Sequence, residues 1–175
     1  MPLIKTSGAG TTASADVVAD PWVSVGDDDP LPAAAPVIVS LTRWERDRDA
    51  LLATGRPVGV RLASHQLATS IAGDLDHLAL VALEFPTFRD GRAYSTARQL
   101  RERFGFKGEL RAVGNVLRDQ LLFMHRCGFD TFEIAHPDAA AAFAKALAEF
   151  TVFYQPATDQ RTPAPRLRHL RSAAE

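Results

Sequence analysis

The chain has 175 residues, which fits a single domain that is large enough to bury a substantial core. Hydrophobic residues make up 46% and charged residues 23% of it, and both values are ordinary for a globular protein. The formal net charge of −1 argues against a general nucleic-acid-binding protein, because such proteins are basic overall. No run approaches the roughly 20 apolar residues of a membrane-spanning helix, and the N-terminus lacks the apolar region of a signal peptide. We therefore expect a cytoplasmic protein with no nucleic-acid and no membrane partner.

A single cysteine, Cys127, excludes an internal disulfide framework and a multi-cysteine zinc or iron–sulfur site within one chain. The histidines have no metal-ligand spacing, and there is neither a Walker motif nor a GxGxxG motif. The sequence therefore predicts no metal site and gives no sign of a cofactor.

The first 36 residues read as an appendage, a β-hairpin followed by an acidic loop. Two short strands are expected at 3–5 and 16–25, joined by a Gly/Thr/Ser-rich stretch, and Trp22 is expected to pin the hairpin to the main domain. The end of the chain, 156–175, contains three prolines and four arginines, which predicts a flexible basic tail.

The segment between them, 37–155, alternates strands with helices. Short apolar runs predict strands at 37–41, 58–62, 78–85, 110–113 and 131–135. Helical spacing predicts a helix capped by Thr42, a weak helical region at 65–71, and helices at 94–104, 116–127 and 137–150. Such alternation gives a parallel sheet with right-handed crossovers. The strand order is either doubly wound or sequential, as in part of a (β/α) barrel.

Four charged residues favour the sequential order. Each of the last four strands carries one charge between apolar neighbours, with signs that alternate along the chain: Arg61, Glu84, Arg111 and Glu133. Alternation of side chains along a strand places all four on the face away from the helices. If the strands are adjacent in chain order, every charge has an opposite neighbour, which buried charges require. We therefore expect an α/β fold of sequential parallel β/α units, forming a partial barrel with an N-terminal β-hairpin. A doubly wound open sheet is the alternative.

The same four charges allow two interpretations. They are either an ion ladder that only sets strand order, or the polar floor of a site at the carboxyl ends of the strands. Five β/α units make only part of a barrel, so either the hairpin and the tail close the gap or a second copy covers it. Of these, we favour a homodimer.

An anion site is the first candidate for chemistry. The loop 89–94 and the pair Gly114–Asn115 both leave a strand end and enter a helix, where free N–H groups and arginines favour phosphate, sulfate or carboxylate. The candidate anion-binding residues are Arg61, Arg89, Arg92, Arg111 and Asn115. Alternatively, Asp90 caps the helix or ties these arginines down, and Gly91 merely makes the turn.

Acid–base chemistry is the second candidate. Glu84 and Glu133 lie on the expected floor, and His136 follows a strand end. Histidine is the residue type best suited to proton transfer near neutral pH. The alternative for His136 is a helix-capping or surface role. A pair between Cys127 and His125 is disfavoured, because residues two apart on a helix do not share a face. Cys127 is instead expected to be a buried structural residue.

A family resemblance is carried by VIVSLTRW, by GVRL and above all by the block EFPTFRDGRAYSTARQLRERFGFKGELRAVGNVLRDQLLFMHRCGFDTFEI. With these motifs the chain resembles the bacterial family known as domain of unknown function 934. The resemblance implies a gene beside those for assimilatory sulfite reductase and sulfonucleotide reductase. Members are therefore labelled as oxidoreductases or accessory proteins of sulfite reduction, and no catalytic residues carry over.

Three functions follow as expectations. The first is an accessory protein of assimilatory sulfite and sulfate reduction, which binds a sulfur oxyanion, a sulfonucleotide, or sulfite or sulfonucleotide reductase itself. The second is a small (β/α) enzyme in which the arginines hold an anionic metabolite and Glu84 or Glu133 acts as acid or base. The third is a purely structural assembly protein.

Overall fold

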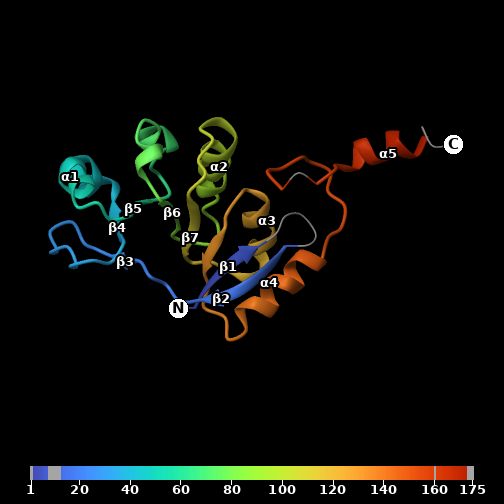
Figure 1. Ribbon diagram of the computed structural model, residues 1–175. Coiled ribbons are helices and arrows are strands. Elements are labelled where there is room, and N and C mark those ends of the chain that lie inside the picture. The colour runs from blue at the N-terminus through green and yellow to red at the C-terminus, as the bar shows by residue number, and fades with distance from the viewer. Residues whose placement is uncertain (1, 8–12, 160, 173–175) are drawn as a thin grey trace.

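The computed structural model describes residues 2–7, 13–159 and 161–172. Eight strands form one sheet in the order β2-β1-β8-β7-β6-β5-β4-β3 in the part of the chain described. The strands are β1 (Leu3–Ser7), β2 (Ser14–Val18), β3 (Val23–Ser24), β4 (Val37–Ser40), β5 (Val58–Leu62), β6 (Leu80–Phe85), β7 (Glu109–Gly114) and β8 (Thr131–Glu133). From β3 to β8 the strands are parallel and follow chain order, and β1 joins β8 antiparallel (Figure 1). The sequential order confirms the partial barrel, and the doubly wound alternative is wrong.

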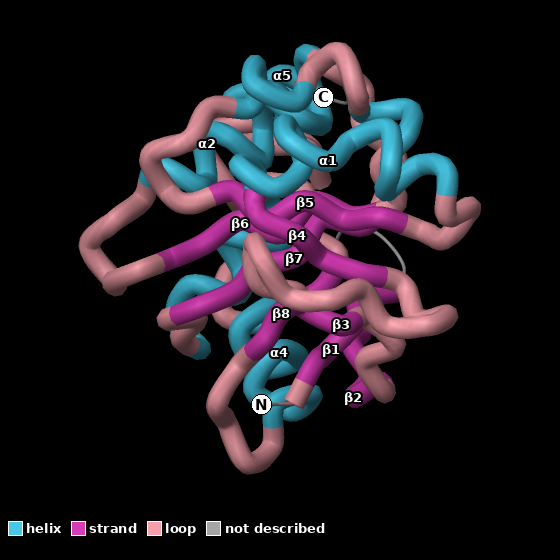
Figure 2. Tube along the Cα trace, turned by 90° about the vertical axis from the view of Figure 1, so that its left-hand side faces the viewer, coloured by secondary structure: helices cyan, strands magenta, loops and turns pink. Residues whose placement is uncertain are grey.

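Helices pack on the convex side of this sheet (Figure 2). They are α1 (Leu41–Ala53), α2 (Arg92–Arg98), α3 (Leu121–Arg126) and α4 (Ala139–Ala148), while α5 (Ala164–Ser172) lies apart from the sheet. Shorter turns are the 3₁₀ segments η2 (Ala68–Ile71), η3 (Leu75–His77) and η5 (Arg118–Gln120) and the π-helical turn η4 (Gln99–Arg103). The core lies between sheet and helices, and its largest fully buried side chains include Trp44, Phe85, Phe129, Phe132 and Phe143.

The strong curl of the sheet follows from its connections. Strand β2 forms one edge and β3 forms the opposite edge, yet only residues 19–22 connect them. Five Cα steps span at most about 18 Å, whereas seven inter-strand spacings of a flat sheet span roughly 34 Å. The two edges must therefore approach each other, and 19–22 crosses the open side of the resulting half-barrel.

Several element boundaries differ from expectation. Helix α1 is capped by Ser40, whose hydroxyl accepts the N–H of Arg43 at 3.0 Å, and not by Thr42. The second hairpin strand ends at Val18, because Val23 and Ser24 pair with β4 at the far edge instead. The helix expected from 94 begins two residues earlier, at Arg92.

The concave face carries a second, smaller apolar cluster. Ile38, Leu80, Ala82 and Val113 are buried there, and Trp22 packs against them. Trp22 thus holds the crossing segment on the main sheet, whereas from the sequence we expect it to pin the hairpin. On this face, the remaining floor of the half-barrel is built from the charged side chains of the strands.

The segment after α4 docks on α3. Arg126 Nε binds Asp159 Oδ2 at 2.9 Å, and Arg126 Nη2 donates to the carbonyl of Gln155 at 2.8 Å. The ring of Phe153 lies under the Arg126 guanidinium, 3.8 Å from its centroid, and also faces Arg161. These contacts of residues 153–159 with Arg126 are called the clamp below. After the clamp, the chain continues into α5, which projects from the body (Figure 1).

Candidate functional site

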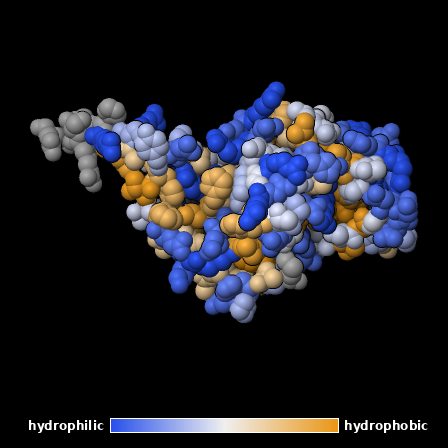
Figure 3. All heavy atoms as spheres, turned by 180° about the vertical axis from the view of Figure 1, so that it is seen from behind, coloured by the Kyte–Doolittle hydropathy of each residue, from blue (hydrophilic) through white to orange (hydrophobic). Residues whose placement is uncertain are grey.

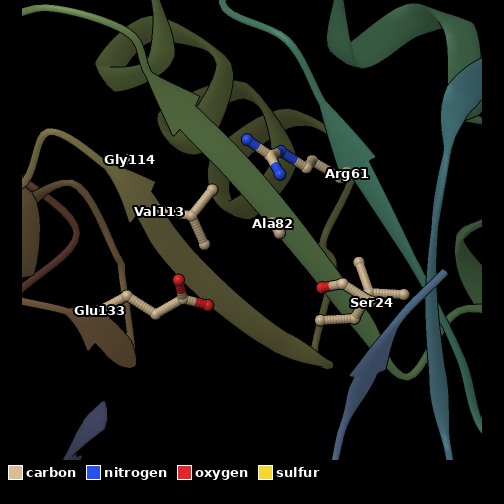
Figure 4. Close-up of a pocket in the computed structure, with 7 residues that line it drawn as sticks. Ser24, Arg61, Ala82, Val113, Gly114 and Glu133 are labelled. Atoms are coloured by element: carbon tan, nitrogen blue, oxygen red, sulfur yellow. The ribbon is translucent and has the colours of Figure 1, made fainter. Parts of the chain in front are cut away.

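A pocket of about 210 Å³ lies on the concave face, among the strands β3 to β8 (Figure 4). Its lining combines apolar side chains from the middle of the sheet with polar groups at the margins: Ser24, Ile38, Arg61, Ala82, Val113, Gly114 and Glu133. Two of the four residues predicted from charge alternation, Arg61 and Glu133, line it directly.

Arg61 and Glu84 form the first ion pair of this floor. Nη2 of Arg61 donates to Oε1 of Glu84 at 2.8 Å. The pairing is diagonal, because Arg61 lies opposite Ala82 in the parallel register and Glu84 lies two residues further along β6. The Arg61 side chain keeps 45% of its surface exposed, so the guanidinium is anchored and still reachable from the pocket.

Arg111 forms the centre of a second, buried cluster. Its side chain is only 1% exposed and is surrounded by three carboxylates. It binds Asp20 at 2.7 and 3.1 Å and Glu109 at 2.9 and 3.0 Å, and Glu133 lies 3.5 Å from Nη1. Burial acts to lower the pKa of Arg111, but the bond to Asp20 and the charge of Glu109 outweigh it and raise that pKa. The guanidinium therefore stays charged and is already occupied by anions of the protein.

These two groups replace the continuous ladder that charge alternation predicts. Arg61 and Arg111 lie level with one another on either side of Ala82. The salt bridges among the described residues join Arg61 to Glu84 and Arg111 to Glu133, but not Glu84 to Arg111. The floor thus consists of two separate ion clusters with an apolar strip between them, and the pocket lies over this strip.

In the loop after β6, the charged side chains bind each other. Arg92 binds Asp90 through Nε and Nη2, at 3.0 and 2.7 Å, and Nη2 also donates to the hydroxyl of Ser64 at 2.9 Å. The Asp90 carboxylate accepts hydrogen bonds from the Arg92 guanidinium and from the Ser64 hydroxyl, and these hold the pKa of Asp90 well below its usual range. Arg89 and Asn115 are exposed on the same rim, and neither lines the pocket. Here Asp90 ties down Arg92, which is the alternative that the sequence left open.

The predicted acid–base residues are dispersed. Glu84 is bound to Arg61, and Glu133 faces the pocket. His136 lies before α4, where its Nδ1 accepts the backbone N–H of Asp138 at 3.1 Å. That is a local turn contact, and His136 does not line the pocket.

Cys127, directly after α3, is buried in the core, whereas the ring of His125 packs against Phe143 of α4. Burial raises the pKa of the Cys127 thiol to about 11, so the thiolate form is rare at neutral pH. Among the described residues, no group of three or more His, Cys, Asp or Glu side chains is arranged to hold a metal ion. Likewise, none of the helices in the described ranges is long and apolar enough to cross a membrane.

The bacterial protein family of unknown function DUF934 matches residues 59–165 of the chain. The chain belongs to this family. Comparison with curated proteins finds none that matches. The DUF934 match begins within β5 and ends in α5, so it contains Arg61, Glu84, Arg111 and Glu133. Ser24 and Asp20, which complete the concave face, lie before it.

Two charged residues of the concave face, Asp20 and Glu109, are missing from the residues predicted from the sequence. Asp20 precedes Trp22 in a segment that reads as part of a hairpin, and no local pattern indicates that it crosses to Arg111. Glu109 does leave a signal, because it lies two residues before Arg111 and therefore shares its face of the strand. Starting β7 at Glu109 rather than at Leu110 reveals this pair.

Proposed function

We propose that this DUF934 protein is an accessory protein of assimilatory sulfite reduction that binds a small sulfur oxyanion in the concave pocket, with Arg61 as the anion-binding group. The observation that carries the proposal is the state of the Arg61 guanidinium. It lines the pocket, and among the described residues only Nη2 has a hydrogen-bond partner. The remaining N–H groups can form the forked contacts that oxyanions prefer.

Glu84 supports this role by fixing Arg61. A guanidinium that is already held in place loses less rotamer freedom when a ligand arrives, and binding costs less entropy. Glu84 also offsets part of the positive charge, so the affinity for a single oxyanion is expected to be moderate. The sulfur context comes from the family resemblance, through the neighbouring genes that it implies.

Pocket size favours the oxyanion itself over a sulfonucleotide. The volume of about 210 Å³ is below the roughly 300–1,000 Å³ of pockets that enclose drug-sized ligands. An accessory role also fits the chemistry of the site better than a redox reaction, because the thiol of Cys127 is buried in the core, away from the pocket.

The test is thermal unfolding of the purified protein with sulfite, sulfate and phosphate. A ligand that binds the native state raises the unfolding midpoint by mass action. We expect sulfite to raise the midpoint of the wild type and of Arg92→Ala, and to leave that of Arg61→Ala unchanged. Arg92 is the matched control because it is an arginine paired with a carboxylate outside the pocket. A shift that survives in Arg61→Ala, or no shift in the wild type, contradicts the proposal.

A second candidate function is docking on the reductase, and an exposed apolar strip favours it. Phe150, Val152 and Tyr154 are 58%, 55% and 77% exposed, while Phe153 between them is held by Arg126. Figure 3 shows apolar side chains gathered where the chain leaves the body toward α5. Exposed apolar patches of this kind mark interaction sites, and the exposed Arg166 and Arg168 of α5 add positive charge beside it.

Co-purification with sulfite reductase tests the docking function. We expect the wild type and Val17→Ser to retain the reductase on a column, and the double variant Phe150→Ser, Tyr154→Ser to lose it. Val17 serves as control because it is 61% exposed on β2, far along the chain from the strip. Equal retention of both variants would exclude the strip as the docking surface.

A further inference from the structure

The two ends of the concave pocket carry opposite charges. Arg61 comes from β5 and Glu133 from β8, and both line the pocket. Figure 4 shows the guanidinium and the carboxylate on either side of Ala82 and Val113. Ile38, on β4, extends the apolar floor on the far side of Arg61. A ligand that lies along this floor therefore meets a cation at one end and an anion at the other.

Of Arg61 and Glu133, Glu133 has the weaker polar contacts with the rest of the protein. No hydrogen bond to its carboxylate is found within the described ranges, and its nearest cation is Arg111 Nη1 at 3.5 Å. Arg111 instead gives its short hydrogen bonds to Asp20 and Glu109. One guanidinium thus faces three carboxylates, and Glu133 is the one left with the weakest contact. Its side chain is 32% exposed, so a cationic group in the pocket can reach it.

An ammonium group is well suited to this end. It carries a compact charge and three N–H donors, and a carboxylate without hydrogen bonds can accept from it at full strength. At the other end, the guanidinium of Arg61 suits an oxyanion. The strip between them is made of Ala82 and Val113, which offer no hydrogen bonds from their side chains and suit a short apolar linker.

The dimensions of the pocket limit the length of that linker. Three inter-strand spacings separate β5 from β8, or about 14 Å between backbones, and the two side chains reaching inward shorten the gap. The volume of about 210 Å³ is below the roughly 300–1,000 Å³ of pockets for drug-sized ligands. A small molecule with its charges at opposite ends fits these limits better than an α-amino acid, whose two charged groups share one carbon.

We propose that the pocket binds a small zwitterion, with an oxyanion group at Arg61 and an ammonium group at Glu133. The chemical class is an ω-amino sulfonate or an ω-amino carboxylate with a short chain. This inference rests on the proposed function, in which Arg61 binds an oxyanion, and it adds the second charged contact at Glu133.

Three matched compounds test the inference on the unmodified protein. They are 3-aminopropanesulfonate, which carries both groups, propanesulfonate, which lacks the ammonium, and propylamine, which lacks the oxyanion. Titration calorimetry is expected to give an affinity for 3-aminopropanesulfonate at least about tenfold above that for propanesulfonate, as one added charge-assisted hydrogen bond provides. Propylamine is expected to bind most weakly. Equal affinities for the two sulfonates overturn the inference.

Two variants locate the ammonium contact. In Glu133→Gln the tenfold preference for 3-aminopropanesulfonate over propanesulfonate is expected to disappear, while propanesulfonate still binds. Glu102 is the control, because it is an exposed glutamate that pairs with Arg98. In Glu102→Gln the preference is expected to remain. A preference that persists in Glu133→Gln places the ammonium elsewhere and overturns the inference. If sulfite and propanesulfonate bind but the amino group adds nothing, only the zwitterion inference fails. If no oxyanion binds, the proposed function fails with it.

Discussion

At the scale of single residues, Arg111 is the group on which the concave face depends most. It is fully buried and neutralises part of the charge of Asp20, Glu109 and Glu133. Breaking a buried ion pair by removing one partner leaves an uncompensated charge. We expect Arg111→Met to lower the free energy of unfolding by about 3–5 kcal/mol, measured by urea titration.

The exposed Arg98 provides the control for Arg111. It pairs with Glu102 one helical turn away, with both side chains nearly half exposed. Arg98→Met is expected to cost less than about 1 kcal/mol in the same titration. Similar losses in the two variants would show that the Arg111 cluster contributes no more than a surface pair.

His125 makes stability depend on pH. Burial lowers the pKa of His125 below its usual value, against the opposing charge of Asp159. Both ring nitrogens are buried without a hydrogen-bond partner in the described chain. The unfolded state therefore binds more protons than the folded state just below the ordinary histidine pKa of about 6.5. Stability must then fall as the pH falls through this range.

We expect the free energy of unfolding of the wild type to fall as the pH is lowered from about 7.5 to 5.5. In His125→Phe this fall is expected to be smaller. Phenylalanine keeps an aromatic ring against Phe143, whose centroid lies 5.6 Å from that of His125. The exposed His65 is the control, and His65→Gln is expected to retain the wild-type slope. Identical slopes in all three proteins would assign the pH dependence to other groups.

Cys127 is predicted to be chemically inert in the folded protein. It is 2% exposed, and burial raises the pKa of its thiol to about 11. At neutral pH, a thiol-specific reagent is expected to label Cys127 only as fast as the protein unfolds locally. In the variant Ser70→Cys, which keeps Cys127, the added cysteine is expected to be labelled at once. Ser70 is exposed. Fast labelling of Cys127 in the wild type would reopen a thiol-based role.

At the scale of elements, the clamp holds the chain after α4 against α3. The Asp159 side chain is 1% exposed and binds both Arg126 and Arg161, and Thr158 donates to the carbonyl of Arg126. This clamp fixes the segment that displays the apolar strip of Phe150, Val152 and Tyr154. Its loss is therefore expected to release the segment.

We expect Asp159→Asn to speed proteolytic cleavage within 150–163, mapped by mass spectrometry. Asp119→Asn is the control, because Asp119 pairs with Arg118 on the surface, and it is expected to leave the cleavage rate unchanged. Cleavage of Asp159→Asn at the control rate would mean that the segment is held by its other contacts, such as that of Phe153 with Arg126.

The parallel elements were predictable from sequence because each carries its own signal. Apolar runs bounded by glycine and proline mark β5 and β6, and charges flanked by apolar residues indicate which face of each strand Arg61 and Glu84 occupy. The boundary between β4 and α1 was harder to predict. Ser40 and Thr42 are both good helix N-caps, and only the backbone geometry decides between them.

At the scale of the whole molecule, the decisive feature is the segment 19–22, and the sequence does not reveal it. A hairpin followed by a loop has the same local pattern whether the loop stays nearby or crosses the half-barrel. The contacts that select the crossing are long-range: Asp20 with Arg111, 91 positions away, and Trp22 with the cluster around Leu80. For the same reason the pocket was predictable only in part, since Ser24 reaches it through this crossing.

The crossing segment also bears on how the half-barrel is completed. It covers part of the open side from within the same chain. The sequence instead assigns the closing of the gap to the hairpin and the tail, and the hairpin strands β1 and β2 extend the sheet beside β8. A homodimer stays a prediction, and sedimentation of the purified protein at several concentrations tests it. A mass that stays at 19.0 kDa throughout would exclude a stable dimer.

The most direct test of the central claim is a crystal structure of the protein soaked with sulfite. We predict density for one oxyanion on the concave face, within hydrogen-bond distance of Arg61 and above the strip of Ala82 and Val113. Density only on the rim at Arg89 or Arg92, or an empty pocket at saturating sulfite, would contradict the account and turn attention to the docking strip after α4.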